Sequence, residues 1–235
     1  MKKSSFLALA VGLMAMAFTS CESSHITSRE PANLAKFTDS GVAKAWAARP
    51  AVRFPATIAA VRIQNCSTYQ NNSGFSVLPV IDDISNEESR EIARQLSGVQ
   101  TIAPLSSLLF TDNKASDLAI RSAAAKLHAN VVLVYTLNTS TNTSDFIEPL
   151  TVLTLGLLPN RTYRVNAVVS AILMDTQTGF VYGTLEEKDS RTGLTMAWGS
   201  EDATTGAMRK AEKSAIKKLL KEFPAFWNNI YRLHK

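Results

Sequence analysis

An alanine-rich helical pattern that leads directly into an unbroken apolar strand is the feature that most constrains the fold. Residues 116–130 carry apolar side chains at helical spacing, and Asn130 stands where a left-handed helix C-cap is expected. Residues 131–135 follow at once as Val-Val-Leu-Val-Tyr. A strand that is apolar on both faces must be covered on both faces. The sequence therefore predicts an α/β fold in which a mixed sheet is flanked by helices.

Capping and turn signals predict further elements. Ser85 and Glu88 form a capping box at the start of a helix, which Gly98 is expected to end. Gly179 supplies the positive φ of a tight connection between two strands, and Pro224 is expected to end the last helix. The predicted helices are 33–48, 85–98, 116–130 and 202–222; the predicted strands or extended segments are 54–63, 75–81, 99–109, 131–135, 161–174 and 180–187; residues 138–145 read as a polar loop.

The first twenty residues have the pattern of a secretory signal. Lys2 and Lys3 precede an uncharged, mostly apolar run over residues 6–18, which is too short to span a bilayer as a helix. Phe18-Thr19-Ser20-Cys21 then resembles a bacterial lipobox, with Phe18 where Leu is usual. We expect cleavage before Cys21 and a lipid with acyl chains such as palmitate on its thiol. Ordinary secretion after Ala15-Met16-Ala17 and a retained anchor are the alternatives.

The expected processing defines the domain organisation and the location. It gives a signal peptide (1–20), a lipidated tether with an N-terminal helical extension (21–53), an α/β domain (54–222) and an aromatic C-terminal tail (223–235). Glu22 in place of Asp after Cys21 favours the outer membrane, facing the periplasm. Of the formal charge of +5, Lys2 and Lys3 leave with the signal. The remaining charge is too small to suggest a nucleic-acid partner, and Cys66 has no second cysteine for a disulfide once Cys21 carries lipid.

The most suggestive chemical cluster is acidic. Asp82, Asp83, Glu87 and Glu88 lie together, and paired carboxylates serve acid–base catalysis or bind divalent cations. They also stand at a helix entrance, where negative charge and capping oxygens are stabilising, and we favour this structural interpretation. The three histidines lack ligand spacing, and nucleotide-binding and hydrolase motifs are absent from the sequence. We therefore expect no metal, no cofactor and no enzymatic activity.

Two apolar segments are candidate surfaces for a partner or a membrane. One is the run 150–158, and the other is the aromatic tail after Pro224. Both could instead be packed into the domain, since exposed apolar patches are rare without a function. The candidate contact residues are Leu153, Leu155, Leu157, Phe226, Trp227 and Tyr231. The lysines and arginines of the final helix, residues 209–221, are interpreted as a solvated face, with anionic lipid or polymer as the functional alternative.

The order of these elements resembles a group of envelope proteins. The helix before residues 131–135, the segment Leu173-Met174-Asp175-Thr176-Gln177-Thr178-Gly179 and the closing helix are similar to the curli-secretion-channel lipoproteins, to the lipoprotein activators of penicillin-binding proteins and to the N-terminal domain of the Tol translocation protein. The resemblance covers residues 54–220. It implies an α/β domain with a scaffold or assembly role in the envelope.

A channel is not expected, because a membrane hairpin needs two strands that each have an apolar face. Only residues 150–158 qualify, since residues 139–144 are polar on both faces. The function predicted is a membrane-anchored, non-enzymatic module that binds an envelope protein or assembles as a homo-oligomer. The alternatives are an enzyme that acts on envelope glycan or lipid through Asp82, Asp83, Glu87 and Glu88, and an export-channel subunit.

Overall fold

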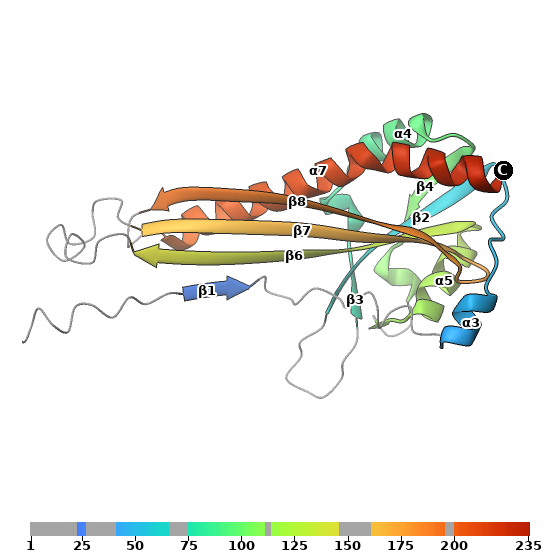
Figure 1. Ribbon diagram of the computed structural model, residues 1–235, viewed down its shortest axis with the longest axis horizontal. Coiled ribbons are helices and arrows are strands. Elements are labelled where there is room, and N and C mark those ends of the chain that lie inside the picture. Colours follow the sequence, from blue (N-terminus) through green and yellow to red (C-terminus); the bar gives the residue numbers. More distant parts are fainter. Residues whose placement is uncertain (1–22, 27–40, 66–74, 111–113, 146–160, 196–199) are drawn as a thin grey trace, which may run out of the picture. The chain divides into compact units, whose positions relative to one another are not determined.

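The structure, a computed structural model, describes residues 23–26, 41–65, 75–110, 114–145, 161–195 and 200–235. It confirms the predicted mixed α/β class (Figure 1). The strands are β1 (Ser23–Ile26), β2 (Ala56–Asn65), β3 (Phe75–Leu78), β4 (Val99–Pro104), β5 (Lys114–Ala115), β6 (Val131–Asp145), β7 (Arg161–Asp175) and β8 (Val181–Thr195). The helices are α3 (Val42–Ala47), α4 (Asn86–Gln95), α5 (Asp117–Lys126) and α7 (Ser200–His234), with 3-10 turns at Val80–Asp82 and Ser107–Leu109.

The sheet has mixed strand directions. Its order is β5-β3-β2-β6-β7-β8, with β4 also paired to β2 and β1 to β6. Strand β2 runs parallel to β4 and β6 and antiparallel to β3. Among the described helices, none is long and apolar enough to cross a membrane.

The chain divides into two compact units. Unit 1 contains residues 1–26, 139–166 and 190–211, and unit 2 contains residues 27–138, 167–189 and 212–235. Strands β6, β7 and β8 and helix α7 each contribute a part to both units.

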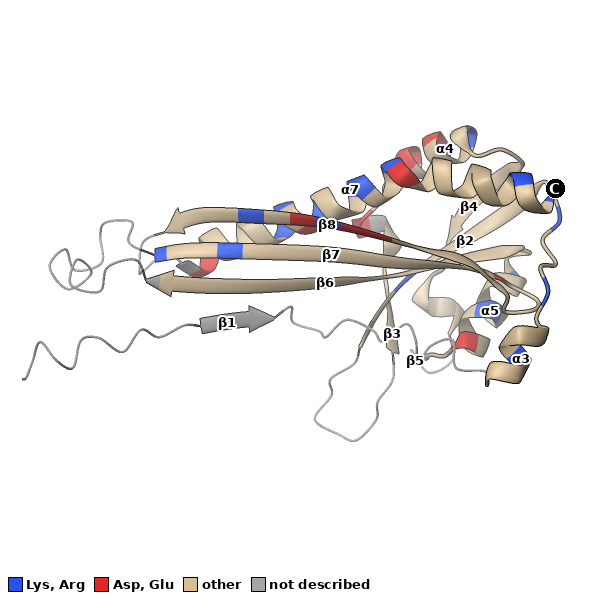
Figure 2. Cartoon of the chain, viewed as in Figure 1, with Lys and Arg blue, Asp and Glu red and all other residues tan. Residues whose placement is uncertain are grey.

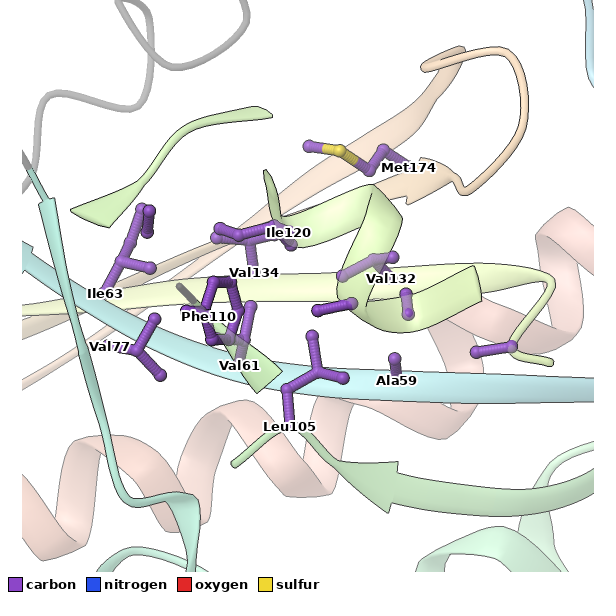
Figure 3. Close-up of a cluster of buried hydrophobic side chains, with 14 of the residues drawn as sticks. Ala59, Val61, Ile63, Val77, Leu105, Phe110, Ile120, Val132, Val134 and Met174 are labelled. Atoms are coloured by element: carbon purple, nitrogen blue, oxygen red, sulfur yellow. The ribbon is translucent and has the colours of Figure 1, made fainter. Parts of the chain in front are cut away.

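Unit 2 holds the main apolar core. Alternate residues of β2 and β6, such as Val61 and Val134, pack against Ile120 of α5 on one face of the sheet (Figure 3). Their neighbours Val131 and Leu133 are also buried, and the alternation of side chains along a strand places them on the opposite face. The prediction that residues 131–135 are covered on both sides is therefore confirmed.

Asn130 does not adopt the left-handed conformation predicted for it. That conformation belongs to His128, with φ of 53°. Asn130 instead joins β6 to β2, because its N–H donates to the Thr57 carbonyl at 2.9 Å and its Oδ1 accepts from the Thr57 N–H at 2.9 Å. The left-handed residue that ends the helix is thus two positions earlier than predicted, and Asn130 bonds to Thr57 of β2.

Helix α7 does not end at Pro224, contrary to the sequence prediction, but continues to His234. A proline inside a helix costs roughly 3 kcal/mol. Phe223, Trp227 and Ile230 on either side of it are all buried, and each burial contributes about 1.5–3 kcal/mol. The burial outweighs the cost, so the residues predicted to form a separate tail are the last turns of the helix.

Residues 138–145 form the second half of β6 and not the loop that their polarity suggested. Thr139, Thr141 and Thr143 are buried, while the residues between them are exposed. In unit 1 the first part of α7 also buries small side chains, among them Thr204 and Ala207. A polar but β-branched sequence fits such a half-buried strand.

Candidate functional site

The Asp175 carboxylate connects the β7–β8 turn with the segment that follows α3. Its Oδ1 accepts from the backbone N–H groups of Gln177 and Thr178 at 2.9 and 3.0 Å. Its Oδ2 accepts from the Ala51 N–H and from the Tyr182 hydroxyl, both at 2.8 Å. Asp175 is 1% exposed. Four donors satisfy a buried negative charge that would otherwise be very unfavourable.

The local sequence explains the turn. Aspartate side chains accept from backbone N–H groups two and three residues ahead, which favours a tight turn. Thr178 Oγ1 accepts from the Phe180 N–H at 3.2 Å, and Gly179 has φ of 72°. The positive φ predicted for Gly179 is therefore confirmed. An added Cβ would lie 3.5 Å from the Arg121 guanidinium carbon, an ordinary van der Waals contact, so the positive φ and not the space restricts substitution there.

Arg121 of α5 binds the other side of the turn. It makes two parallel bonds to Asp117, from Nε at 2.9 Å and from Nη2 at 2.8 Å. Its Nη1 donates to the carbonyls of Thr176 and Gln177 at 3.4 and 3.3 Å. The hydrogen bonds to Asp117 raise the pKa of the guanidinium, against the opposing effect of burial. Arg121 therefore stays charged and holds the turn against α5.

Helix α3 lies beside this corner. Val52 N–H donates to the Tyr182 hydroxyl at 3.3 Å, one residue after the bond from Ala51 to Asp175. A hollow of about 240 Å³ separates α3 from the turn, and it is lined by Lys44, Ala45, Ala48, Asp117, Arg121, Met174, Thr178, Gly179, Phe180 and Val181. We call this arrangement the Asp175 corner. Its sequence signal was the Asp-x-x-Thr-Gly pattern, but nothing in the pattern indicated that Asp175 also holds the N-terminal segment.

The chemistry of the Asp175 corner suits anchoring better than proton transfer. Burial, followed by the hydrogen bond to Asp175, raises the pKa of the Tyr182 phenol well above its usual value. The phenol therefore stays protonated and donates to a carboxylate that already accepts three backbone N–H groups. These bonds occupy both oxygens of the most buried carboxylate in the corner.

The acidic cluster is divided among structural roles. Glu88 and Ser85 form the predicted capping box, with Ser85 Oγ accepting from the Glu88 N–H at 3.2 Å and Glu88 Oε2 accepting from the Ser85 N–H at 2.9 Å. The backbone hydrogen bond from Ser85 lowers the pKa of Glu88 more than any other influence. The predicted helix start is confirmed, while Asp82 and Glu87 are exposed.

Asp83 has long-range partners that the sequence did not indicate. Arg62 Nη1 donates to both of its oxygens, at 2.9 and 3.1 Å, and the Tyr135 hydroxyl donates to Oδ2 at 2.8 Å. Burial and the charge of Asp83 raise the pKa of Tyr135 well above its usual value. No group of three metal-ligating side chains that could hold an ion occurs among the described residues.

The sequence-predicted contact residues fall into two sets. Trp227 is 0% exposed and donates from Nε1 to the Ser97 carbonyl at 2.8 Å, so its side chain packs inside unit 2 and is not available to a partner. Tyr231 packs edge-on against Phe54 with 4.8 Å between ring centroids, and Phe226 is partly buried. Cys21, Leu153, Leu155 and Leu157 lie outside the described residues.

The cationic face of α7 is partly balanced by acids. Lys218 Nζ lies 2.7 Å from Asp189 and donates to the Lys188 carbonyl at 2.9 Å. Lys213 and Lys217 lie close enough to Glu88 for their charges to lower its pKa. Figure 2 shows both signs of charge on α4 and α7. This face therefore agrees better with a solvated surface than with a dedicated anion site.

Unit 1 has a second hollow, of about 630 Å³. It is lined by Tyr163, Ser190, Arg191, Thr192, Asp202, Ala203, Gly206, Ala207 and Lys210. Gly193 leaves room for the Tyr163 side chain, which contacts the position that a Cβ would occupy. Beside it, Ser190 Oγ donates to Asn166 Oδ1 at 2.9 Å. The charges here are mixed and face an open hollow.

Comparison with known proteins finds distant similarities in structure and none in sequence. No family model and no curated protein matches the sequence. Protein XCC0632 of Xanthomonas campestris, of family DUF330, is 10% identical over 79% of this chain and 93% of that chain, with a TM-score of 0.29. A PelC dodecamer from Paraburkholderia phytofirmans is 14% identical over 85% of this chain and 96% of that chain, with a TM-score of 0.26. Neither is one of the proteins that the sequence resembles, so that resemblance stays a prediction.

Proposed function

We propose that the chain is a lipid-anchored, non-enzymatic binding or assembly module of the bacterial envelope. Cys21 carries the lipid, the outer membrane is its location, and an envelope protein or further copies of the chain are its partners. The observation that best supports this proposal is that the buried carboxylates are occupied by hydrogen bonds within the protein. Asp83 is engaged by Arg62 and Tyr135, and Asp175 accepts four hydrogen bonds at a structural corner.

The remaining members of the acidic cluster agree with this proposal. Glu88 caps α4, and Asp82 and Glu87 are exposed. An enzyme that used Asp82, Asp83, Glu87 and Glu88 would need these carboxylates to converge on a substrate. Asp83 and Glu88 instead accept hydrogen bonds from other groups of the protein. The hollows of about 240 and 630 Å³ are lined by other residues.

The first experiment determines the mature N-terminus by mass spectrometry, on the wild type and on Cys21→Ala from fractionated cells. We expect a diacylglyceryl- or triacylglyceryl-modified Cys21 in the membrane fraction, and Cys21→Ala either unprocessed or lost from the membrane. An unmodified N-terminus near Phe18 would contradict the anchor. With the anchor established, crosslinking in intact cells identifies the partner or detects copies of the chain.

A second experiment separates a binding module from an enzyme. The double variant Asp82→Asn with Glu87→Gln removes the two exposed charges that take no part in the cap, and it leaves the Asp83 network and the Ser85–Glu88 cap in place. We expect it to complement a deletion strain as well as the wild type does. Failure to complement by a folded, membrane-located variant would favour the enzyme.

A further inference from the structure

We propose that α3 and the residues that follow it rest on the surface of an anionic lipid bilayer. The surface consists of residues 41–53, which we call the α3 segment. This inference rests on the proposed lipid anchor and adds to it a second contact with the same membrane. It assigns a role to the most exposed apolar side chains near the Asp175 corner.

The outward face of α3 is apolar, and its two largest side chains are exposed. Val42 is 87% exposed and Trp46 is 83% exposed. The two residues are four positions apart, so they lie on the same side of the helix. None of the residues of α3 is buried. A tryptophan with this exposure beside a valine is typical of a surface that meets another phase or a partner.

The Asp175 corner fixes the direction of that face. Lys44, Ala45 and Ala48 line the hollow against the β7–β8 turn, so this side of α3 faces the protein. The bonds from Ala51 to Asp175 and from Val52 to Tyr182 hold the segment just after the helix. Trp46 is thus presented by a helix that is fixed to the domain on its other side.

The charge of the α3 segment favours a bilayer over a neutral protein surface. Residues 41–53 contain three cations, Lys44, Arg49 and Arg53, and no acidic residue, and Figure 2 shows α3 and the chain beyond it without red. Arg49 Nη1 also donates to the backbone carbonyl of Trp46 at 3.1 Å. Each basic residue near an anionic membrane contributes about 1 kcal/mol, and tryptophan prefers the membrane–water interface.

The position of the α3 segment in the chain favours the same occupant. Twenty residues separate Cys21 from Val42. A chain of that length spans at most about 75 Å even when fully extended. A lipid on Cys21 would therefore limit the α3 segment to within about 75 Å of the bilayer, a tethering that raises the local concentration at which weak apolar and electrostatic contacts can form.

The experiment measures the surroundings of Trp46 in the lipidated protein, purified from envelopes and reconstituted in vesicles. One set of vesicles is phosphatidylcholine, and the other also contains phosphatidylglycerol. The Trp46 signal is obtained by subtracting the emission of the Trp46→Phe variant from that of the wild type. The subtraction removes the emission of Trp198 and Trp227, which both proteins share. Nitroxide lipids labelled near the headgroup report contact with lipid, and acrylamide, an uncharged quencher, reports exposure to water.

In anionic vesicles we expect headgroup nitroxide to lower the Trp46 emission about twofold or more and acrylamide to lose access to Trp46. Arg49→Glu with Arg53→Glu should abolish both effects. The matched control, Arg209→Glu with Lys221→Glu, reverses two exposed cations on α7 and should leave both effects intact. Urea unfolding of each variant confirms that it is folded.

Two results would overturn the inference. Trp46 could remain as accessible to acrylamide in anionic vesicles as in detergent, or it could become shielded from acrylamide without quenching by the lipid label. The second result would indicate contact with protein. Failure of the proposed function gives a different readout, because mass spectrometry of the same preparation would then find no lipid on Cys21.

Discussion

Asp175 is the residue on which several parts of unit 2 converge, because one carboxylate serves the turn, Tyr182 and Ala51. Asp175→Ala would leave the Tyr182 hydroxyl and the Ala51 N–H without their acceptor. We expect the free energy of unfolding, measured in urea, to fall by about 3 kcal/mol. The exposed Asp82→Ala should change it by less than about 0.5 kcal/mol. Equal effects of the two variants would refute a special role for Asp175.

Tyr182 gives a prediction for alkaline pH. Its pKa is raised in the folded state, so the unfolded chain loses this proton first as the pH rises above about 10. The native state then binds more protons than the unfolded state, and stability decreases with pH. The stabilisation that comes from the raised pKa of Tyr182 is fully present below about pH 10. We expect Tyr182→Phe to be less stable at pH 8 but to lose less stability between pH 8 and 11, as measured by urea midpoints.

Thr141 offers a stabilising substitution. Its Oγ1 is buried and has no hydrogen-bond partner within the described part of the chain. Valine has nearly the same shape and no hydroxyl, so Thr141→Val removes an unsatisfied polar group from unit 1. We expect the free energy of unfolding to rise by about 1 kcal/mol. Exposed Asn142→Val on the same strand is the control; a loss of stability in Thr141→Val would indicate that its hydroxyl has a partner after all.

Among whole elements, those set by neighbouring residues were predictable and those set by distant contacts were not. The capping box of Ser85 and Glu88 involves residues three apart, and the Gly179 turn closes within five residues. Asp83, in contrast, binds a side chain 52 positions away. No local pattern records such a pairing, so the acidic cluster could be recognised while the partners that occupy it could not.

Polarity misled the sequence interpretation at two elements. Residues 138–145 read as a loop because they are rich in Asn, Ser and Thr, yet their alternation of buried and exposed side chains is that of a strand. Pro224 read as a helix end, although the burial of Phe223 and Trp227 on either side favours continuing the helix. In both cases packing against another element overrides local propensity, and packing partners are not visible in a local pattern.

The last turns of α7 should therefore contribute strongly to stability. Trp227 is fully buried, and its indole N–H donates to the Ser97 carbonyl. We expect Trp227→Ala to lower the free energy of unfolding by about 4 kcal/mol. Trp46→Ala is the matched control, because Trp46 is 83% exposed and its loss should cost less than about 0.5 kcal/mol. Equal costs in urea unfolding would contradict the packing of this helix.

At the scale of the whole molecule, the two units differ in what they bury. The buried residues of unit 2 include Trp227, Phe223, Ile58 and Leu105. Those described in unit 1 are threonines and alanines with Val165, among them Thr139, Thr141, Thr143, Thr195, Thr204, Ala207 and Ala211. Apolar area removed from water stabilises by about 25 cal/mol per Å², so each buried side chain of unit 1 contributes less.

This difference predicts that unit 1 opens more easily than unit 2. Strand β6 provides an internal comparison, because residues 131–138 belong to unit 2 and residues 139–145 to unit 1. Where local opening exposes little apolar surface, its free energy is low and the backbone amides exchange with solvent faster. In hydrogen–deuterium exchange we expect protection along β6 to fall by about tenfold or more beyond residue 138. Uniform protection along the strand would show that the two units open together, and Thr141→Val should then stabilise them equally.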